Sequence, residues 1–105
     1  TLVLALNYGS RDELVRAARA CLADGLSGDE VTEEAIEARL DTAGLPAPDL
    51  IVRTSGEERL SNFLMWQSAY AEFVFTSTLW PDFGAEELAK ACETFAARER
   101  RYGGL

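Results

Sequence analysis

The sequence predicts an α/β domain built on a parallel sheet with helices on both faces. Short apolar runs rich in β-formers alternate with longer segments whose apolar residues recur at helical spacing, and Gly, Pro and Asn separate the two kinds of segment. Strands that alternate with helices are joined by right-handed crossovers, which make neighbouring strands parallel. With 105 residues, 48% apolar and 27% charged, the chain has the composition of one globular domain.

The first half of the chain predicts one strand and two helices. Residues 1–6 form a short apolar run before the turn-prone letters NYGS, which is typical of a buried strand. A helix is expected over residues 11–24, where Ser10 and Glu13 have the spacing of a capping box. Thr32 is expected to cap the second helix, because two glutamates follow it in the first turn.

The second half predicts two more strands and two more helices. Strands are expected over residues 49–54 and 72–77, which are rich in β-branched and aromatic residues. Between them, residues 61–71 have helical spacing, with Ser61 placed to cap the helix. The last helix is expected to open at Asp82, just after a proline.

Charge and residue types exclude several function classes. The formal net charge of −8 makes nucleic acid and anionic membrane surfaces poor partners. The chain has no histidine, so it cannot itself supply a Ser-His-Asp triad or a His-ligated zinc. Cys21 and Cys92 lack a CxxC partner and are expected to be small core residues in a reducing compartment.

Hydropathy and the first residue bear on location and completeness. The sequence contains no apolar run of membrane-spanning length and no signal-peptide layout, so a cytoplasmic location is expected. The first residue is Thr1, not Met, and it opens directly on an apolar run. We therefore expect the chain to be a piece of a longer protein.

A polar loop follows the second predicted strand and is the leading candidate site. Arg53 ends that strand, Gly56 permits a tight turn, and Arg59 and Ser61 lead into a predicted helix whose first amides have no helical partner. Ligands of parallel sheets bind at the carboxyl ends of strands, and guanidinium groups beside a helix N-terminus suit phosphate or diphosphate. The alternative is that the arginines only form surface salt bridges with neighbouring acids, Asp49, Glu57 and Glu58.

Other candidate site residues also have ordinary structural explanations. Asn7 ends the first predicted strand, but NYGS is also an ordinary turn. Glu72 and Asp82 could be magnesium ligands, although a helix N-cap explains Asp82 better. The aromatic residues around the third strand fit a core or a subunit interface.

Three segments of the chain resemble a known family. PDLIVRTSGEERLSNFLMWQSAYAEFVFTSTLWPDF is similar to the C-terminal signature of the cis-prenyltransferases, the undecaprenyl (polyprenyl) diphosphate synthases. ALNYGSRDEL and RERRYGG resemble the flanking motifs in order and spacing. The resemblance implies that residues 1–105 are the C-terminal portion of a single catalytic domain whose N-terminal half is absent from this chain.

The resemblance also implies roles for individual residues. Arg53, Arg59 and Ser61 match the residues that bind the isopentenyl diphosphate headgroup in the family. Glu72 matches a glutamate that helps to hold Mg²⁺, although the start of a strand should lie at the opposite end of the sheet from Arg53. Further substrate contacts are expected from Asn7 and from Arg101 and Gly103, which resemble an RxG element that reaches the partner subunit.

The implied reaction condenses isopentenyl diphosphate with an allylic prenyl diphosphate, with Mg²⁺ as cofactor, in a homodimer that makes a membrane-associated lipid. The implied location is cytoplasmic and peripheral to the membrane. The family's HxxMDGNxRWA segment is missing from the chain, so the fragment alone is expected to be inactive. Within the loop, Glu58 stands where some relatives have His and Ser55 where Gly is common. Two rival interpretations are a non-catalytic accessory subunit of a two-component cis-prenyltransferase and an unrelated phosphometabolite-binding module.

Overall fold

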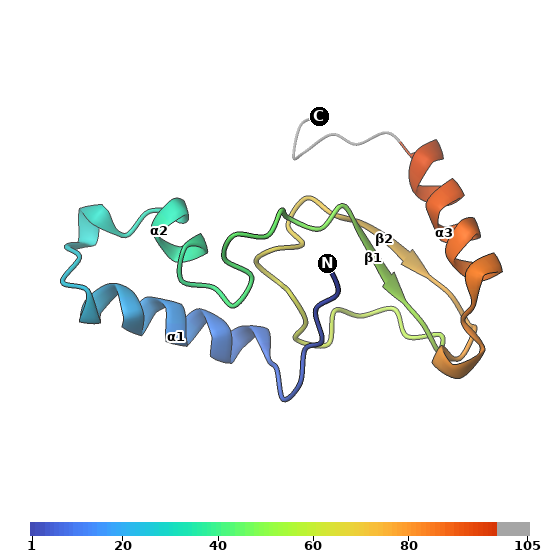
Figure 1. Cartoon of the computed structure of the whole chain (residues 1–105), viewed down its shortest axis with the longest axis horizontal. Helices are drawn as coiled ribbons and strands as arrows, with labels where there is room; N and C mark the ends of the chain where they lie inside the picture. The colour runs from blue at the N-terminus through green and yellow to red at the C-terminus, as the bar shows by residue number, and fades with distance from the viewer. Residues whose placement is uncertain (99–105) are drawn as a thin grey trace. The chain divides into compact units, whose positions relative to one another are not determined.

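The computed structural model describes residues 1–98, which fall into two compact units (Figure 1). The helical unit comprises Thr1–Pro46 together with Asn62–Met65. The sheet unit comprises, among the described residues, Ala47–Ser61 and residues 66–98. Each unit is described by itself.

The helical unit contains α1 (Ser10–Ala23), a 3₁₀ turn (Gly28–Glu30) and the short α2 (Glu33–Glu37). Helix α1 lies beside α2 (Figure 1), and its Ala17 and Cys21 are buried. Its C-terminus is a Schellman motif, because the amides of Gly25 and Leu26 bond to the carbonyls of Leu22 and Cys21 at 3.0 and 3.1 Å. The glycine has φ of 78°, which other L-residues rarely adopt.

The start of α1 differs from the prediction, whereas the start of α2 agrees with it. Gly9 is the N-cap of α1, and the carboxyl group of Glu13 bonds elsewhere, so the capping box predicted for Ser10 and Glu13 is wrong. The hydroxyl of Thr32 accepts a hydrogen bond from the amide of Ala35 at 3.1 Å, which confirms the predicted cap.

The sheet unit contains β1 (Leu50–Arg53), β2 (Glu72–Phe75), a 3₁₀ turn (Trp80–Asp82) and α3 (Ala85–Ala97). The two strands pair in parallel, with Leu50 opposite Glu72 and Arg53 opposite Phe75. Helix α3 contacts β2 (Figure 1). The parallel α/β class predicted from the sequence is therefore confirmed.

The last helix begins later than predicted. Asp82 lies in the 3₁₀ turn that contains Pro81, and α3 opens three residues further on. Gly84 precedes it, and the Glu87 carboxylate accepts a hydrogen bond from the Gly84 amide at 2.9 Å. This bond closes the first turn of α3 and also holds the pKa of Glu87 below its ordinary value.

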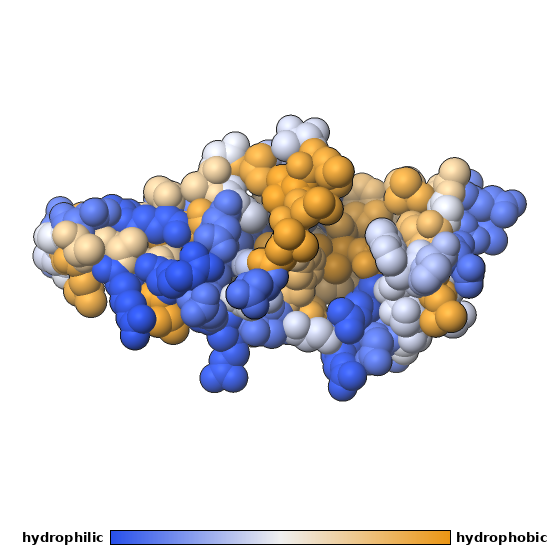
Figure 2. All heavy atoms as spheres, turned by 60° about the horizontal axis from the view of Figure 1, so that its bottom comes forward, coloured by the Kyte–Doolittle hydropathy of each residue, from blue (hydrophilic) through white to orange (hydrophobic). Residues whose placement is uncertain are grey.

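Two predicted elements are absent from the described residues. Residues 1–6 are exposed rather than a buried strand, and within residues 1–98 no strand pairs with them. Figure 2 shows broad apolar areas on the visible face, and the exposed apolar side chains include Leu2, Val3, Leu4 and Leu6. An apolar run gains strand geometry only when a neighbouring strand satisfies its amides and carbonyls, so the pattern alone was insufficient.

The helix predicted over residues 61–71 is also wrong, since the segment forms a series of turns. Ser61, Asn62 and Leu64 have φ values of 53°, 60° and 45°, which an α-helix cannot contain. The carbonyl of Asn62 and the amide of Met65 bond to Ser10 at the start of α1 instead, as described below. The second face of the sheet is consequently not covered by this predicted helix.

The two cysteines differ in burial. Cys21 is buried against the rest of the helical unit, as predicted, whereas Cys92 is exposed on α3, so its predicted core position is wrong. Among residues 1–98, no helix is long and apolar enough to cross a membrane.

Candidate functional site: the loop after β1

The loop that follows β1 begins with a tight turn over residues 54–57. Ser55 and Gly56 have φ of 65° and 72°, and positive φ at both central residues is the pattern of a type I′ turn. The amide of Glu57 bonds weakly to the carbonyl of Thr54 at 3.4 Å and closes the turn. A Cβ on Gly56 would meet nothing within 4 Å, so the glycine is required by the backbone conformation and not by lack of space.

The segment after β2 holds this turn in place. The amides of Ser55 and Gly56 donate to the carbonyls of Thr78 and Thr76, both at 2.9 Å, and the Thr76 amide donates to the Arg53 carbonyl at 2.9 Å. The Thr76 hydroxyl in turn accepts a bond from the Thr78 amide at 3.2 Å. The loops after the two parallel strands therefore meet at the carboxyl edge of the sheet, where ligands of such sheets bind.

The three predicted diphosphate contacts lie in or next to this loop, in the sheet unit. Arg53 is partly buried at the end of β1, whereas Arg59 and Ser61 are exposed. The guanidinium group of Arg59 forms an ion pair with Glu57 at 2.9 Å, and its side chain is 73% exposed. For Arg59, the salt bridge considered as the alternative is thus present in this structure.

The helix N-terminus expected next to Ser61 is absent from the described residues. Ser61 was expected to cap a helix whose free amides would face an anion, but it has φ of 53° and no helix begins there in the described residues. Guanidinium groups and a hydroxyl are therefore the groups that this loop can offer to a phosphate.

Glu72 lies at the other end of the sheet from Arg53. It opens β2 and is paired with Leu50, three residues before the pair formed by Arg53 and Phe75. At about 3.3 Å per residue, the two ends are about 10 Å apart along the strands. The Glu72 carboxylate lies 3.5 Å from the guanidinium group of Arg98, which also donates to the carbonyl of Phe73.

The described residues do not form a magnesium site on their own. Among residues 1–98, no group of three or more Cys, Asp or Glu side chains gathers as a set of metal ligands. Glu72 offers one carboxylate, and hard cations such as Mg²⁺ take several oxygen ligands.

The remaining predicted contacts lie outside the sheet unit or outside the described residues. Asn7 belongs to the helical unit, where it has φ of 51° just before α1. Arg101 and Gly103 lie outside the described residues.

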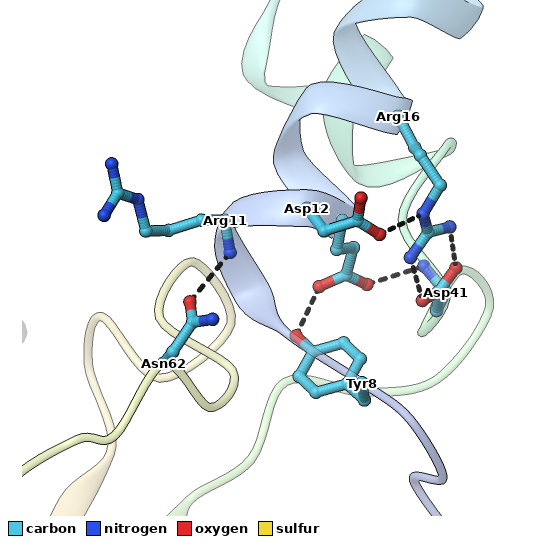
Figure 3. A network of polar contacts seen from close by, with 7 residues as sticks. Tyr8, Arg11, Asp12, Arg16, Asp41 and Asn62 are labelled. Atoms are coloured by element: carbon cyan, nitrogen blue, oxygen red, sulfur yellow. Dashed lines mark hydrogen bonds and ion pairs between the residues drawn. The ribbon is translucent and has the colours of Figure 1, made fainter.

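A polar network fixes the start of α1 in the helical unit (Figure 3). The fully buried carboxyl group of Glu13 accepts hydrogen bonds from the Tyr8 hydroxyl at 2.5 Å and from the Asp41 amide at 2.7 Å. Burial, and then the bond to Glu13, raise the pKa of Tyr8 above its ordinary value. Arg16 bonds both carboxylate oxygens of Asp41 at 2.8 Å and so lowers the pKa of that carboxyl group.

Sequence reasoning missed Asn62, which contacts the same helix start. Its side-chain oxygen accepts a hydrogen bond from the Arg11 amide at 2.9 Å (Figure 3), and its carbonyl accepts one from the Ser10 amide at 2.9 Å. The available signal was an asparagine next to Ser61, because Asn tolerates positive φ better than most residues. The apolar helical pattern around it pointed to a helix instead.

The fold and the loop define a class: a parallel α/β protein with an arginine-rich candidate anion site at the carboxyl ends of its strands. Residues 1–103 match the family model described as "Putative undecaprenyl diphosphate synthase". The chain belongs to this undecaprenyl diphosphate synthase family.

Relatives of known name support the same assignment. The chain is 57% identical over its whole length to an isoprenyl transferase of Agrobacterium fabrum and 49% identical to one of Treponema pallidum. It spans 44% and 47% of those two proteins, so it corresponds to less than half of each.

Solved structures of the family have the same fold over this chain. A lavandulyl diphosphate synthase from Lavandula x intermedia, in complex with dimethylallyl diphosphate, matches with a TM-score of 0.88 and 42% identity. A probable undecaprenyl diphosphate synthase from Campylobacter jejuni matches with a TM-score of 0.80 and 40% identity. Each comparison covers 95% of this chain and 45% or 46% of the other.

Proposed function

We propose that this chain is the part of a cis-prenyl diphosphate synthase that binds the headgroup of isopentenyl diphosphate. In the reaction a new carbon–carbon bond forms between this substrate and an allylic diphosphate as the allylic carbon–oxygen bond breaks, so that diphosphate leaves the allylic partner and a proton is lost from the isopentenyl carbon chain. The observation that supports the proposal is Arg53 at the carboxyl end of β1, followed by a loop that carries a second arginine, Arg59, in a protein of this family.

The ion pair of Arg59 is compatible with this role. The pair with Glu57 lies in solvent, with side chains 73% and 41% exposed, and exposed pairs contribute about 0–1 kcal/mol. A diphosphate offers several charged acceptors, and charge-assisted hydrogen bonds contribute about 1.5–3 kcal/mol each. Arg59 can therefore exchange Glu57 for a diphosphate at small cost.

Arg53, Arg59 and Ser61 would each contact the diphosphate in a different way. Arg53 is held at the end of β1, so its position is set by the sheet. Arg59 and the hydroxyl of Ser61 follow on the loop and would add further donors to the diphosphate oxygens. Together they would hold the substrate alkene in one orientation relative to the allylic carbon, which is how positioning contributes to rate.

We also propose that the whole enzyme uses Mg²⁺ and that Glu72 supplies one ligand. When bound, such a cation offsets negative charge on the diphosphates. Further oxygen ligands would complete the site, since no group of three or more possible ligands gathers among residues 1–98. A homodimer and a cytoplasmic location, peripheral to the membrane, stay predictions.

The proposed function is tested by turnover of the full-length protein. With labelled isopentenyl diphosphate, an allylic diphosphate and Mg²⁺, we expect solvent-extractable prenyl product, and none from residues 1–105 alone. Activity that appears only after addition of a second subunit would favour the accessory-subunit interpretation. Competition by simple sugar phosphates as strong as that by isopentenyl diphosphate would favour a general phosphate-binding module.

Replacement of Glu72 tests the magnesium proposal. In the full-length enzyme, Glu72→Gln is expected to raise the Mg²⁺ concentration for half-maximal activity about tenfold, because one charged ligand is lost. Direct Mg²⁺ binding, followed by titration calorimetry with diphosphate present, should weaken in parallel. The matched control is Arg98→Met, which removes the partner of Glu72 but no carboxylate. If both variants change Mg²⁺ dependence equally, the role of Glu72 is the ion pair and not the metal.

A further inference from the structure

We infer that Thr76 is a positioning residue for the diphosphate-binding loop, and that its hydroxyl acts by fixing the segment after β2 against the turn that follows β1. The inference rests on the proposed function, since it concerns the same loop. All of the residues involved belong to the sheet unit. Thr76 is assigned no contact with the substrate, and its contribution is to hold the residues that bind it.

The chain after β2 continues beside the chain after β1 beyond the end of the two strands (Figure 1). The Thr76 amide donates to the Arg53 carbonyl, and the Thr76 carbonyl accepts from the Gly56 amide, both at 2.9 Å. The Thr78 carbonyl accepts from the Ser55 amide at 2.9 Å. The short segment after β2 therefore satisfies the amides of both central residues of the turn.

The Thr76 side chain fixes the shape of this segment. Its hydroxyl accepts a hydrogen bond from the Thr78 amide and donates one to the Thr78 hydroxyl, both at 3.2 Å. A Ser or Thr hydroxyl that bonds the amide two residues further on forms a local turn of its own. Residue 78 is thereby held through two of its atoms, and its carbonyl is kept in place for the Ser55 amide.

The turn after β1 depends on such support because its backbone is strained. Ser55 has φ of 65°, a conformation in which a residue with a Cβ is less stable than glycine. Strained conformations persist where the surrounding contacts determine them. The bonds from the amides of Ser55 and Gly56 to the segment after β2 are two such contacts. Loss of the Thr76 hydroxyl should therefore loosen the turn, although no residue of the turn has changed.

The turn sets the direction in which the chain leaves β1, and with it the course of the loop that carries the proposed contacts. Arg53 comes just before the turn, and Arg59 and Ser61 follow shortly after Gly56. Fixing the start of a loop before a ligand binds lowers the conformational entropy lost on binding. Release of the turn should therefore weaken binding of isopentenyl diphosphate without changing the groups that bind it.

The test compares kinetic constants of full-length variants. Thr76→Val keeps the β-branched shape and the backbone but removes the hydroxyl. We expect the KM for isopentenyl diphosphate to rise about three- to tenfold, as the loss of one hydrogen bond changes an equilibrium constant. The kcat and the KM for the allylic substrate should change less than about twofold. Thr76→Ser restores the hydroxyl and should restore the KM. The matched control is Ser77→Ala, which removes the exposed neighbouring hydroxyl and should leave the KM unchanged.

A double variant tests whether Thr76 acts through the loop. When Arg59 is already alanine, the Thr76 hydroxyl has one binding group fewer to position. The rise in KM of the variant that combines Thr76→Val with Arg59→Ala should therefore be smaller than the product of the two single rises. A combined rise equal to that product would show that Thr76 acts independently of Arg59 and would overturn the inference.

Gly56→Ala is the second test of the turn, and it leaves every hydroxyl in place. A Cβ on Gly56 would meet no atom within 4 Å, so alanine disfavours only the positive φ of 72°. The KM for isopentenyl diphosphate should again rise. If Thr76→Val and Gly56→Ala lower the melting temperature but leave that KM unchanged, while Arg59→Ala raises it, the turn is only structural and the inference is wrong. If Arg59→Ala leaves the KM unchanged as well, the proposed function itself fails.

Discussion

Replacement of Arg59 by alanine is expected to raise the KM for isopentenyl diphosphate about 10- to 100-fold in the full-length enzyme, and Arg53→Ala should have an effect of the same size. Each variant removes charge-assisted hydrogen bonds worth about 1.5–3 kcal/mol, and 1.4 kcal/mol corresponds to a factor of ten. Steady-state kinetics with isopentenyl diphosphate as the varied substrate measures the effect. The kcat should fall less than kcat/KM, because the lost contacts bind the part of the substrate that does not react.

Two controls make this result specific. Arg19→Ala removes an exposed arginine of α1 and should leave the KM unchanged, which excludes a general effect of net charge. Arg59→Lys keeps the charge but loses the planar fork of donors, so its KM should lie between those of wild type and Arg59→Ala. An unchanged KM in both alanine variants would contradict the assignment of the loop.

Replacement of Glu13 by alanine is expected to cost about 2–4 kcal/mol of unfolding free energy, the largest stability effect that we predict for this chain. Both oxygens of this fully buried carboxyl group accept hydrogen bonds, from the Tyr8 hydroxyl and the Asp41 amide (Figure 3). The alanine variant would leave these donors without their acceptor and would open a cavity at the start of α1. Denaturant unfolding of the full-length protein measures the loss.

Glu13→Gln and Glu93→Ala are the matched controls. The glutamine fills the same space but places an amide nitrogen where one donor requires an acceptor, so an intermediate loss is expected. Glu93 is exposed on α3, and its replacement should change stability by less than about 0.5 kcal/mol. If the Glu13→Ala and Glu93→Ala variants have the same free energy of unfolding, the buried network makes no net contribution to stability.

Two features that depend on neighbouring residues in the sequence were predicted correctly. The β-branched run at β1 and the threonine cap of α2 both appear as expected. The position of Glu72 was also predictable, because parallel pairing places the start of one strand opposite the start of the next. The register of the two strands confirms that Glu72 and Arg53 lie at opposite ends of the sheet.

Long-range contacts account for what the sequence could not predict. Residues 61–71 have a helical apolar pattern, yet the bonds from Asn62 and Met65 to Ser10 and Arg11 impose positive φ values at their start. The two residues joined by a side-chain hydrogen bond are 51 residues apart for Arg11 and Asn62 and 55 residues apart for Ser10 and Met65. No local sequence pattern reveals contacts over such separations. The strand predicted over residues 1–6 is absent for a related reason. A strand requires a neighbouring strand to pair with, and the described residues do not provide one.

The central claim is that the loop after β1 binds the diphosphate of isopentenyl diphosphate. A crystal structure of the full-length protein with this substrate, in the absence of an allylic partner, tests it most directly. We predict diphosphate oxygens within hydrogen-bonding distance of the guanidinium groups of Arg53 and Arg59 and of the Ser61 hydroxyl, with Arg59 released from Glu57. Substrate bound elsewhere, with the Arg59–Glu57 ion pair intact, would contradict the claim.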